Sequence, residues 1–372
     1  MDGCEYPHSM PFTEAERAEI LANCTQFLAF GGGKPFAQKM REIAESEYAE
    51  ERQDFYGNGG MVARVEAEVA ELLGKEAAVF MPSGTMAQQI ALRIWCDRAG
   101  GNTVAYQPTS HLEIHEQGAY RELHHLRAVL LGESDRLFTL GDLKGLDEMI
   151  NSLLIELPQR EIGGQLPTWP ELLGICDWAS SRDIKLHMDG ARLWECAPYY
   201  QKSYAEISAL FDSVYVSFYK ILQGLPGAIL AGPADFIAES RVWLRRHGGN
   251  LYTLAPNAIA AKIGLDSQLP RIPEYVAKAA EIASALEGIE GLEVVPLKPP
   301  TNMMHLYFHG DKDRLEEAFW EIARDEKMIL CRGLRETEKP GVFKMELSVS
   351  GHTMDLDVAC MRVLMARVME SA

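Results

Sequence analysis

The stretch LHMDGARLWECAPYY, residues 186–200, decides the fold prediction because it runs from apolar residues straight into an aspartate and an arginine. Asp189 follows the apolar Leu186 and Met188, so it lies at or just past the end of a predicted strand. A strand that ends on a carboxylate can aim that group at a ligand. The alternative interpretation is an ordinary turn, in which Asp189 is a cap and Arg192 is exposed.

Further strand-like runs lie on both sides of this stretch, and helical patterns fall between most of them. The predicted strands are 77–81, 103–106, 126–131, 153–157, 185–188, 214–216 and 228–231. This alternation predicts an α/β fold with a mainly parallel sheet flanked by helices. In such folds the chemistry lies at the carboxyl ends of the strands.

Sequence patterns near the two ends of the chain predict an N-terminal helical arm and a small C-terminal domain. Thr13 and Glu16 form a capping box for a first helix that runs to Phe30 and stops at the glycines 31–33. Pro35 begins a second helix toward Arg52, and residues 61–73 form a third helix. After residue 255 we expect a smaller C-terminal α/β domain, with strands 292–295, 303–307 and 342–349 and helices 311–325 and 355–369. The predicted domains are an N-terminal helical arm (1–50), a large domain (51–254) and a small domain (255–372).

Composition excludes several classes of function. The 372 residues include 36 basic and 54 acidic side chains, and the formal net charge of −18 disfavours binding to nucleic acid or anionic membranes. The seven cysteines are scattered, with no CxxC pair, as is usual in a reducing compartment. No signal peptide or membrane span is expected, because the uncharged run 77–92 is broken by proline, glycine and glutamines. We therefore expect a cytoplasmic protein.

The stretch PSGTMAQQIAL, residues 82–92, follows the first predicted strand of the sheet. Ser83 and Gly84 make a turn and Thr85 opens a helix. Free backbone N–H groups at a helix start, beside small hydroxyl residues, bind phosphate. An equally good interpretation is that Ser83 is a plain N-cap in front of a core helix.

A lysine follows another predicted strand, in DSVYVSFYKILQGLPGAILAG, residues 212–232. Lys220 has aromatic and aliphatic neighbours, and it is the only charged residue from Ser213 to Ala234. Desolvation lowers a lysine pKa and makes the amine a nucleophile toward an aldehyde. The alternative is a surface lysine whose aliphatic stem covers apolar neighbours.

Two other site types are disfavoured. His187 and Asp189 share one face of a strand and offer only two metal ligands, so no metal site is expected. The glycines of YGNGG, residues 56–60, lack the GxGxxG spacing and follow no strand, so they do not form a nucleotide-binding loop. An aspartate at a strand end can instead hold the protonated ring nitrogen of a pyridine cofactor.

The order of phosphate loop, aspartate and lysine resembles the pyridoxal-phosphate enzymes of the aspartate-aminotransferase-like fold (fold type I). The chain is more closely similar to the threonine aldolase and β-eliminating lyase family, on the stretches SGTMA, HLEIHEQGA, HMDGARLW, DSVYVSFYK and RRHGGNLY. The likeness runs from Phe55 to about Ala261. It implies a lyase that uses pyridoxal 5'-phosphate and acts on an amino acid.

The resemblance also implies roles for individual residues. Ser83, Gly84 and Thr85 would bind the cofactor phosphate, His111 would stack on the ring or act as a base, Asp189 would pair with the ring nitrogen, and Lys220 would be the Schiff-base lysine. Arg192 and Glu116 would lie on the substrate side, with Arg192 binding the carboxylate. The family is typically homo-oligomeric, so we expect a homodimer or homotetramer.

The chain departs from the family pattern mainly near the substrate. IELPQREIGG replaces a Leu-Glu-Asn-Thr-His run, Tyr219 stands before the lysine where serine is usual, ILQGLPG replaces the segment after it, and Tyr252 and Thr253 follow the glycines 248–249. A second carboxylate-binding arginine has no clear counterpart in KMELSVSGH. The leading hypothesis is retro-aldol cleavage of a β-hydroxy amino acid such as threonine or allo-threonine to glycine and an aldehyde. The alternatives are a related lyase or transferase acting on another amino acid, or a cofactor-binding homologue without aldolase turnover.

Overall fold

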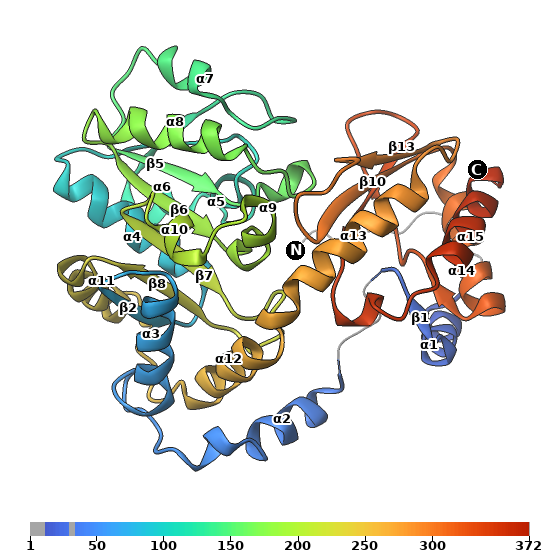
Figure 1. Ribbon diagram of the computed structural model, residues 1–372, viewed down its shortest axis with the longest axis horizontal. Helices are drawn as coiled ribbons and strands as arrows, with labels where there is room; N and C mark the ends of the chain where they lie inside the picture. The colour runs from blue at the N-terminus through green and yellow to red at the C-terminus, as the bar shows by residue number, and fades with distance from the viewer. Residues whose placement is uncertain (1–11, 30–33, 372) are drawn as a thin grey trace. The chain divides into compact units, whose positions relative to one another are not determined.

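The central sheet has the strand order β2-β8-β7-β6-β5-β3-β4 (Figure 1). The computed structural model describes residues 12–29 and 34–371. The strands are β2 (Ala77–Met81), β3 (Thr103–Tyr106), β4 (Arg127–Leu130), β5 (Ser152–Glu156), β6 (Lys185–Gly190), β7 (Ser213–Ser217) and β8 (Ala228–Gly232). All neighbouring pairs from β7 to β4 are parallel, whereas β8 is antiparallel to both β2 and β7. The predicted fold class is confirmed.

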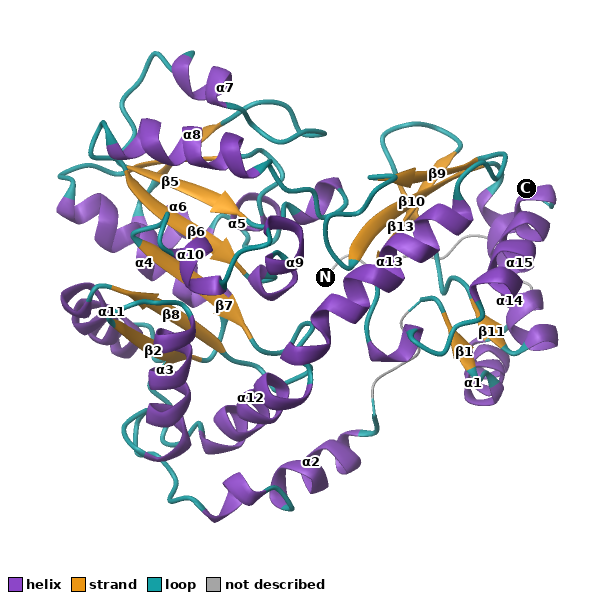
Figure 2. Cartoon of the chain, viewed as in Figure 1, coloured by secondary structure: helices purple, strands orange, loops and turns teal. Residues whose placement is uncertain are grey.

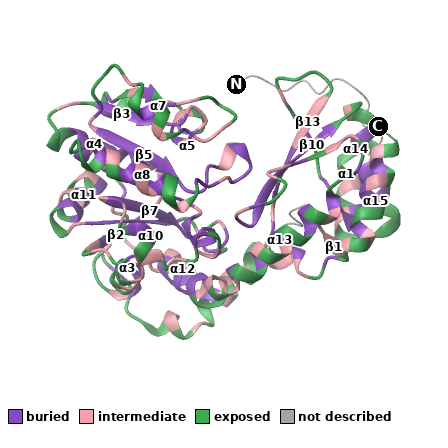
Figure 3. Ribbon diagram, turned by 45° about the horizontal axis from the view of Figure 1, so that its top comes forward, coloured by how far each residue is buried: buried purple, intermediate pink, exposed green. Residues whose placement is uncertain are grey.

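Helices cover this sheet, as Figure 2 shows. The helices of the larger unit are α2 (Phe36–Ala44), α3 (Gly60–Leu72), α4 (Gly84–Arg98), α5 (His111–Ile114), α6 (Ala119–His124), α7 (Leu140–Lys144), α8 (Trp169–Ser180), α9 (Ala197–Tyr200), α10 (Tyr204–Ser208), α11 (Ala234–Arg246) and α12 (Ala255–Ser267). Helix α2 packs on α12 and not on the sheet. Helix α4 packs across several central strands, α8 packs on β6, and α3 packs on β2. Every residue of β5, β7 and β8 is buried, as expected for strands covered on both faces (Figure 3).

A second, smaller unit contains α1 (Glu14–Asn23), β1 (Gln26–Phe27), β9 (Leu292–Val295), β10 (Met303–His309), α14 (Lys312–Glu326), β11 (Met328–Ile329), β12 (Arg335–Glu336), β13 (Val342–Ser348) and α15 (Val358–Glu370). Its antiparallel sheet has the order β12-β13-β10-β9, and β1 pairs in parallel with β11. Helix α13 (Ile272–Leu286) begins where the larger unit ends.

Packing groups residues 34–273 into the larger unit, and the described residues before 30 with those from Glu274 onward into the smaller one. Helix α12 belongs to the larger unit because it packs on α3. These units differ from the predicted ranges 1–50, 51–254 and 255–372. The predicted functional division into an arm and two domains stays a prediction.

The first helix is shorter than predicted. Its capping box is present, with the Thr13 Oγ1 accepting the Glu16 N–H at 3.3 Å. The helix ends at Asn23 instead of Phe30, because the N–H of Thr25 donates to the Lys327 carbonyl at 2.9 Å and the chain then pairs with β11. The glycines 31–33 lie outside the described residues. The second helix likewise ends at Ala44 and is followed by a 3₁₀ turn, Glu47–Glu50, so it does not continue toward Arg52.

Within residues 12–29 and 34–371, no helix is both long enough and apolar enough to cross a membrane.

Candidate active site

One pocket collects residues from the carboxyl ends of β6 and β7, from the start of α4 and from the region of α5. Six of the predicted site residues line it, together with three others: Gly84, Thr85, His111, Glu116, Asp189 and Lys220, with Ala191, Tyr215 and Tyr219. The first and the last of these residues, Gly84 and Lys220, lie 136 positions apart in the chain, and the parallel topology brings them to one edge of the sheet. Ser83 and Arg192 are not among the lining residues.

Asp189 is the buried acid of the pocket. It occupies the fifth position of β6, is 2% exposed, and accepts the N–H of Ala191 through Oδ1 at 3.0 Å. Burial raises the pKa of its carboxyl, and the Lys220 and His111 charges act in the opposite direction. A buried carboxylate of this kind is stabilised by a cationic partner.

The DGAR turn has small side chains after Asp189 because β7 leaves little space beside Gly190. A Cβ added at Gly190 would lie 2.5 Å from the Tyr215 carbonyl oxygen of β7. The Ser217 hydroxyl donates to the Ala191 carbonyl at 2.8 Å. The turn therefore stays close to β7, and this closeness brings Asp189 and Lys220 into the same pocket.

Lys220 follows β7 after Phe218 and Tyr219. Burial, and to a smaller extent the positive charge of Arg192, lowers the pKa of its amine to about 8. Its Nζ lies 5.9 Å from the centroid of the Tyr219 ring. A substantial fraction of this amine is therefore neutral near physiological pH and able to attack a carbonyl carbon.

His111 begins α5 and is held at two points. Its Nδ1 lies 3.0 Å from Oε1 of Glu116, and this hydrogen bond raises the pKa of the imidazole. Its backbone N–H donates to Oε2 of Glu156 at 2.9 Å. Because a carboxylate only accepts hydrogen bonds, Nδ1 carries the hydrogen and Nε2 is left with a lone pair.

Glu156, the glutamate of IELPQREIGG, was given no role from the sequence, and its contacts could not be predicted. It ends β5, opposite Asp189 in the ladder, and its Oε1 accepts the Arg160 N–H at 3.1 Å. Burial, together with the Asp189 charge, raises the pKa of Glu156 to about 7. The carboxylate ties the start of α5 to the 3₁₀ turn Arg160–Ile162.

The predicted phosphate loop lies at the start of α4. Ser83 is the N-cap, and its Oγ accepts the Met86 N–H at 3.3 Å, so the plain-cap interpretation of Ser83 is present in the structure. Helix α4 begins at Gly84, one residue earlier than predicted, and Gly84 and Thr85 line the pocket. The N-terminus of a 15-residue helix favours an anion by its N–H groups and its dipole.

Arg192 and Glu195 do not line the pocket, but the charges of both act on Lys220. Arg192 precedes the 3₁₀ turn Leu193–Glu195, and its charge lowers the pKa of Lys220. Glu195 is 2% exposed, and burial raises the pKa of its carboxyl to about 8. The sequence analysis did not single out Glu195, because its spacing from the predicted strand reveals nothing about its burial.

His187, considered above as a metal ligand, has another role. It is fully buried, with Nδ1 2.8 Å from the Ser213 Oγ and Nε2 2.6 Å from Gln88 Oε1. Both ring nitrogens therefore link β6 to β7 and α4. Burial lowers the pKa of His187 to about 3 and keeps the ring neutral.

The chemistry of the pocket fits pyridoxal phosphate. Asp189 is an acid for a ring nitrogen, Lys220 is an amine for an aldehyde, and the start of α4 offers N–H donors to a phosphate. Tyr215 fills the space that a side chain at Gly84 would need, because a Cβ there would lie 2.0 Å from the Tyr215 hydroxyl. The glycine thus allows the Tyr215 hydroxyl to lie close to the start of the helix.

Comparisons with known proteins agree with this site. Residues 36–309 match the family model described as beta-eliminating lyase. A protein of Arabidopsis thaliana named "Probable low-specificity L-threonine aldolase 2" is 30% identical over 283 residues, which are 73% of this chain and 79% of that protein.

Two solved structures are also similar. A protein from Listeria monocytogenes EGD-E, provisionally described as an L-allo-threonine aldolase, shares 41% identity with a TM-score of 0.90, over 95% of this chain and 98% of that one. A protein from Exiguobacterium sp. 255-15, provisionally described as an aromatic amino acid beta-eliminating lyase/threonine aldolase, shares 39% identity with a TM-score of 0.90, over 96% and 99%.

The fold and the pocket are those of a pyridoxal-phosphate-dependent lyase of fold type I. The chain belongs to the beta-eliminating lyase family. The predicted family, cofactor and class of carbon–carbon lyase are confirmed. The roles predicted for single residues stay predictions, although the structure brings six of the eight into one pocket.

Proposed function

We propose that the protein cleaves a β-hydroxy amino acid of the threonine or allo-threonine type between Cα and Cβ, giving glycine and an aldehyde. The observation that carries this proposal is the single pocket holding Lys220, Asp189 and His111, in a chain whose relatives are named threonine aldolases. The identity of 41% over 95% of the chain supports the allo-threonine type as a substrate.

Different pocket residues bind different parts of the cofactor. Lys220 binds the aldehyde carbon, Asp189 pairs with the ring nitrogen, and Gly84 and Thr85, with Ser83 beside them, hold the phosphate. Pyridoxal phosphate, when bound, supplies an electron-withdrawing ring that accepts the electron pair freed at Cα. Asp189 supports this withdrawal, because its negative charge keeps a proton on the ring nitrogen.

Arg192 and His111 act on the substrate. Arg192 binds the substrate carboxylate as a charge-assisted pair, which fixes the orientation of the bond to be broken. Glu116 holds Nδ1 of His111, which leaves Nε2 of the neutral imidazole as the proton acceptor. The predicted contact of Glu116 with substrate remains part of the proposal, but its hydrogen bond supports a role through His111.

The proposed reaction balances in atoms and charge. His111 removes the proton of the substrate β-hydroxyl, directly or through water, and the oxygen forms the carbonyl of the leaving aldehyde. The Cα–Cβ electron pair stays with Cα, which then takes up a proton to become glycine. Stacking of His111 on the cofactor ring alone is the other role that its place in the pocket allows.

The proposal is tested by supplying threonine, allo-threonine and phenylserine to the purified protein with pyridoxal phosphate, and by measuring aldehyde and glycine. We expect equal amounts of the two products from at least one substrate, and none from a Lys220→Ala variant. If none of the three yields aldehyde, the aldolase assignment is wrong. A related lyase or transferase, or a homologue without aldolase turnover, would then take its place.

A cytoplasmic location and a homo-oligomeric assembly, either dimer or tetramer, complete the proposal. The location is supported by the scattered cysteines, six of which are free thiols in the described residues. The assembly is supported by the family resemblance. Sedimentation of the purified protein measures the assembly directly, and a monomer would contradict it.

A further inference from the structure

Two tyrosines that the sequence analysis assigned to no cofactor role face the predicted phosphate loop. Tyr215, in the middle of β7, is 3% exposed and lines the pocket. Its hydroxyl is so near the first residue of α4 that a Cβ at Gly84 would lie 2.0 Å from it. The phenol therefore ends beside the N–H groups that the helix start presents.

Tyr219 brings a second hydroxyl to the same place. It lines the pocket and is 44% exposed, and its side chain is hydrogen-bonded to that of Tyr215. It also stands directly before Lys220. The two residues, called here the tyrosine pair, have two O–H groups and one mutual hydrogen bond, so one O–H remains to donate elsewhere.

We propose that the tyrosine pair donates a hydrogen bond to the phosphate of pyridoxal phosphate and forms the wall of the phosphate site opposite the start of α4. The inference rests on the proposed function, because it takes the cofactor to be bound at Lys220. The pair is then a cofactor-binding element in its own right.

The chemistry of the pair favours phosphate over the other groups in the pocket. Burial raises the pKa of Tyr215 well above its ordinary value, so its hydroxyl remains a neutral donor at any working pH. A phosphate dianion is an acceptor, and the helix N–H groups converge on the same space. The pair supplies a further donor without bringing a second cation near Lys220, whose pKa is already lowered by Arg192.

The test compares two ligands on the cofactor-free full-length protein. Pyridoxal phosphate and pyridoxal share the aldehyde and the ring, but only the first has a phosphate. Affinities for both are measured by absorbance titration on the unmodified protein and on Tyr219→Phe and Tyr215→Phe. Tyr200→Phe is the matched control, because it removes a buried phenol that donates to the Pro167 carbonyl and does not line the pocket.

The hydrogen bond to Tyr219 raises the pKa of Tyr215, so Tyr215 donates it and the Tyr219 O–H is the one left for the phosphate. We expect Tyr219→Phe to bind pyridoxal phosphate about tenfold to a hundredfold more weakly, as for a lost hydrogen bond to a charged group, and Tyr215→Phe, which removes only the bond within the pair, to lose less. Pyridoxal should bind as it does to the unmodified protein, and Tyr200→Phe should bind both ligands normally. Because Tyr219 is partly exposed, Tyr219→Phe decides the question even if Tyr215→Phe does not fold.

Two outcomes would overturn the inference. Unchanged affinity of Tyr219→Phe for pyridoxal phosphate shows that the pair does not bind the phosphate. An equal loss of affinity for both ligands shows that the pair acts on the ring or on Lys220. If the unmodified protein itself binds neither ligand, the proposed function fails as well, and this result is distinct from the other two.

Discussion

At the scale of single residues, the environment decides what each side chain can do. Lys220 is an ordinary lysine by composition, but burial and the Arg192 charge lower its pKa to about 8. Asp189 and Glu156 lie opposite each other in the β5–β6 ladder, and burial raises the pKa of both. A cationic group placed beside Asp189 would be held firmly, which is what a protonated pyridine ring requires.

The lowered pKa of Lys220 predicts how the cofactor attaches to the cofactor-free protein. Only the neutral amine attacks the aldehyde, so the rate of attachment should rise with pH through a midpoint near 8. Absorbance after rapid mixing with pyridoxal phosphate measures this rate.

The variant Arg192→Gln provides the control for that prediction. Removing the nearby positive charge favours the charged amine, so the pKa of Lys220 should rise and the midpoint should move to higher pH. A midpoint near that of a free lysine in the unmodified protein would show that Lys220 is not activated.

The hydrogen bond between Glu116 and His111 predicts a change in the pH profile of activity. It raises the pKa of His111. In Glu116→Gln the charge is lost, the pKa of His111 should fall, and the acidic limb of kcat/KM should move to lower pH. If that limb does not move, His111 is not the base, and stacking on the ring remains its role.

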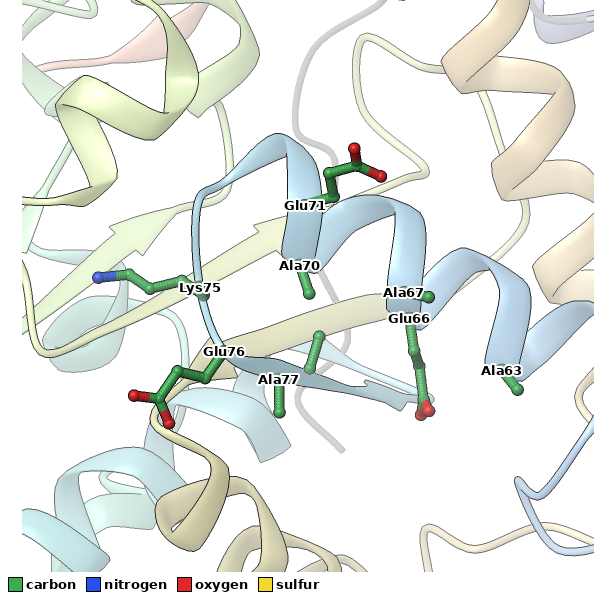
Figure 4. A pocket seen from close by; sticks show the side chains of 9 residues that line it. Ala63, Glu66, Ala67, Ala70, Glu71, Lys75, Glu76 and Ala77 are labelled. Carbon is green, nitrogen blue, oxygen red and sulfur yellow. The ribbon is translucent and has the colours of Figure 1, made fainter.

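At the scale of elements, the edge of the central sheet depends on one buried carboxylate. Figure 4 shows Glu66 extending from α3 toward β2, while Glu71 points away from the strand. Glu66 accepts the Phe80 N–H at 2.7 Å and pairs with Arg241 at 2.6 Å, and Arg241 also donates to the Ala78 carbonyl. Together they satisfy backbone groups of the edge strand β2 and attach it to α3 and α11.

We expect Glu66→Ala to lower the free energy of unfolding by about 1–3 kcal/mol, because it leaves a buried N–H without its acceptor. Glu71→Ala on the exposed face of the same helix should change it by less than about 0.5 kcal/mol. Denaturant unfolding measures both values. Equal stabilities for the two variants would show that the edge does not depend on Glu66.

Most strands could be predicted from the sequence, because each is a short apolar run bounded by turn residues. Strands β2, β3 and β9 have the predicted bounds, and the other predicted strands differ by one or two residues at one or both ends. The two-residue strands β1, β11 and β12 were not predicted. The early end of α1 was missed because β1 pairs with β11, some 300 positions away. A local sequence pattern does not show which distant segment a strand pairs with. The apolar run that marks β8 does not give its direction, which is antiparallel both to β2 and to β7, the strand just before it in the chain.

Candidate site residues could be predicted from the sequence only where they belong to a recognisable motif. Asp189, Lys220 and the start of α4 follow strands and could be found by that rule. Tyr215 and Glu195 could not, because their roles depend on what lies across the fold from them: the first residue of α4 for Tyr215, and the interior behind the DGAR turn for Glu195.

At the scale of the whole molecule, the larger unit contains every residue that lines the pocket, and the family match extends across it into the smaller unit. The departures from the family pattern lie mostly near the substrate, whereas the groups proposed for the cofactor are retained. The central proposal therefore concerns the cofactor: we propose that the protein holds pyridoxal phosphate on Lys220.

The most direct test mixes the purified protein with pyridoxal phosphate, reduces the product with borohydride and locates the modified residue by peptide mass spectrometry. A pyridoxyl group on Lys220 is the predicted result, and it would leave the identity of the substrate as the next question. The absence of an adduct, or an adduct on another lysine, would contradict the account of the active site.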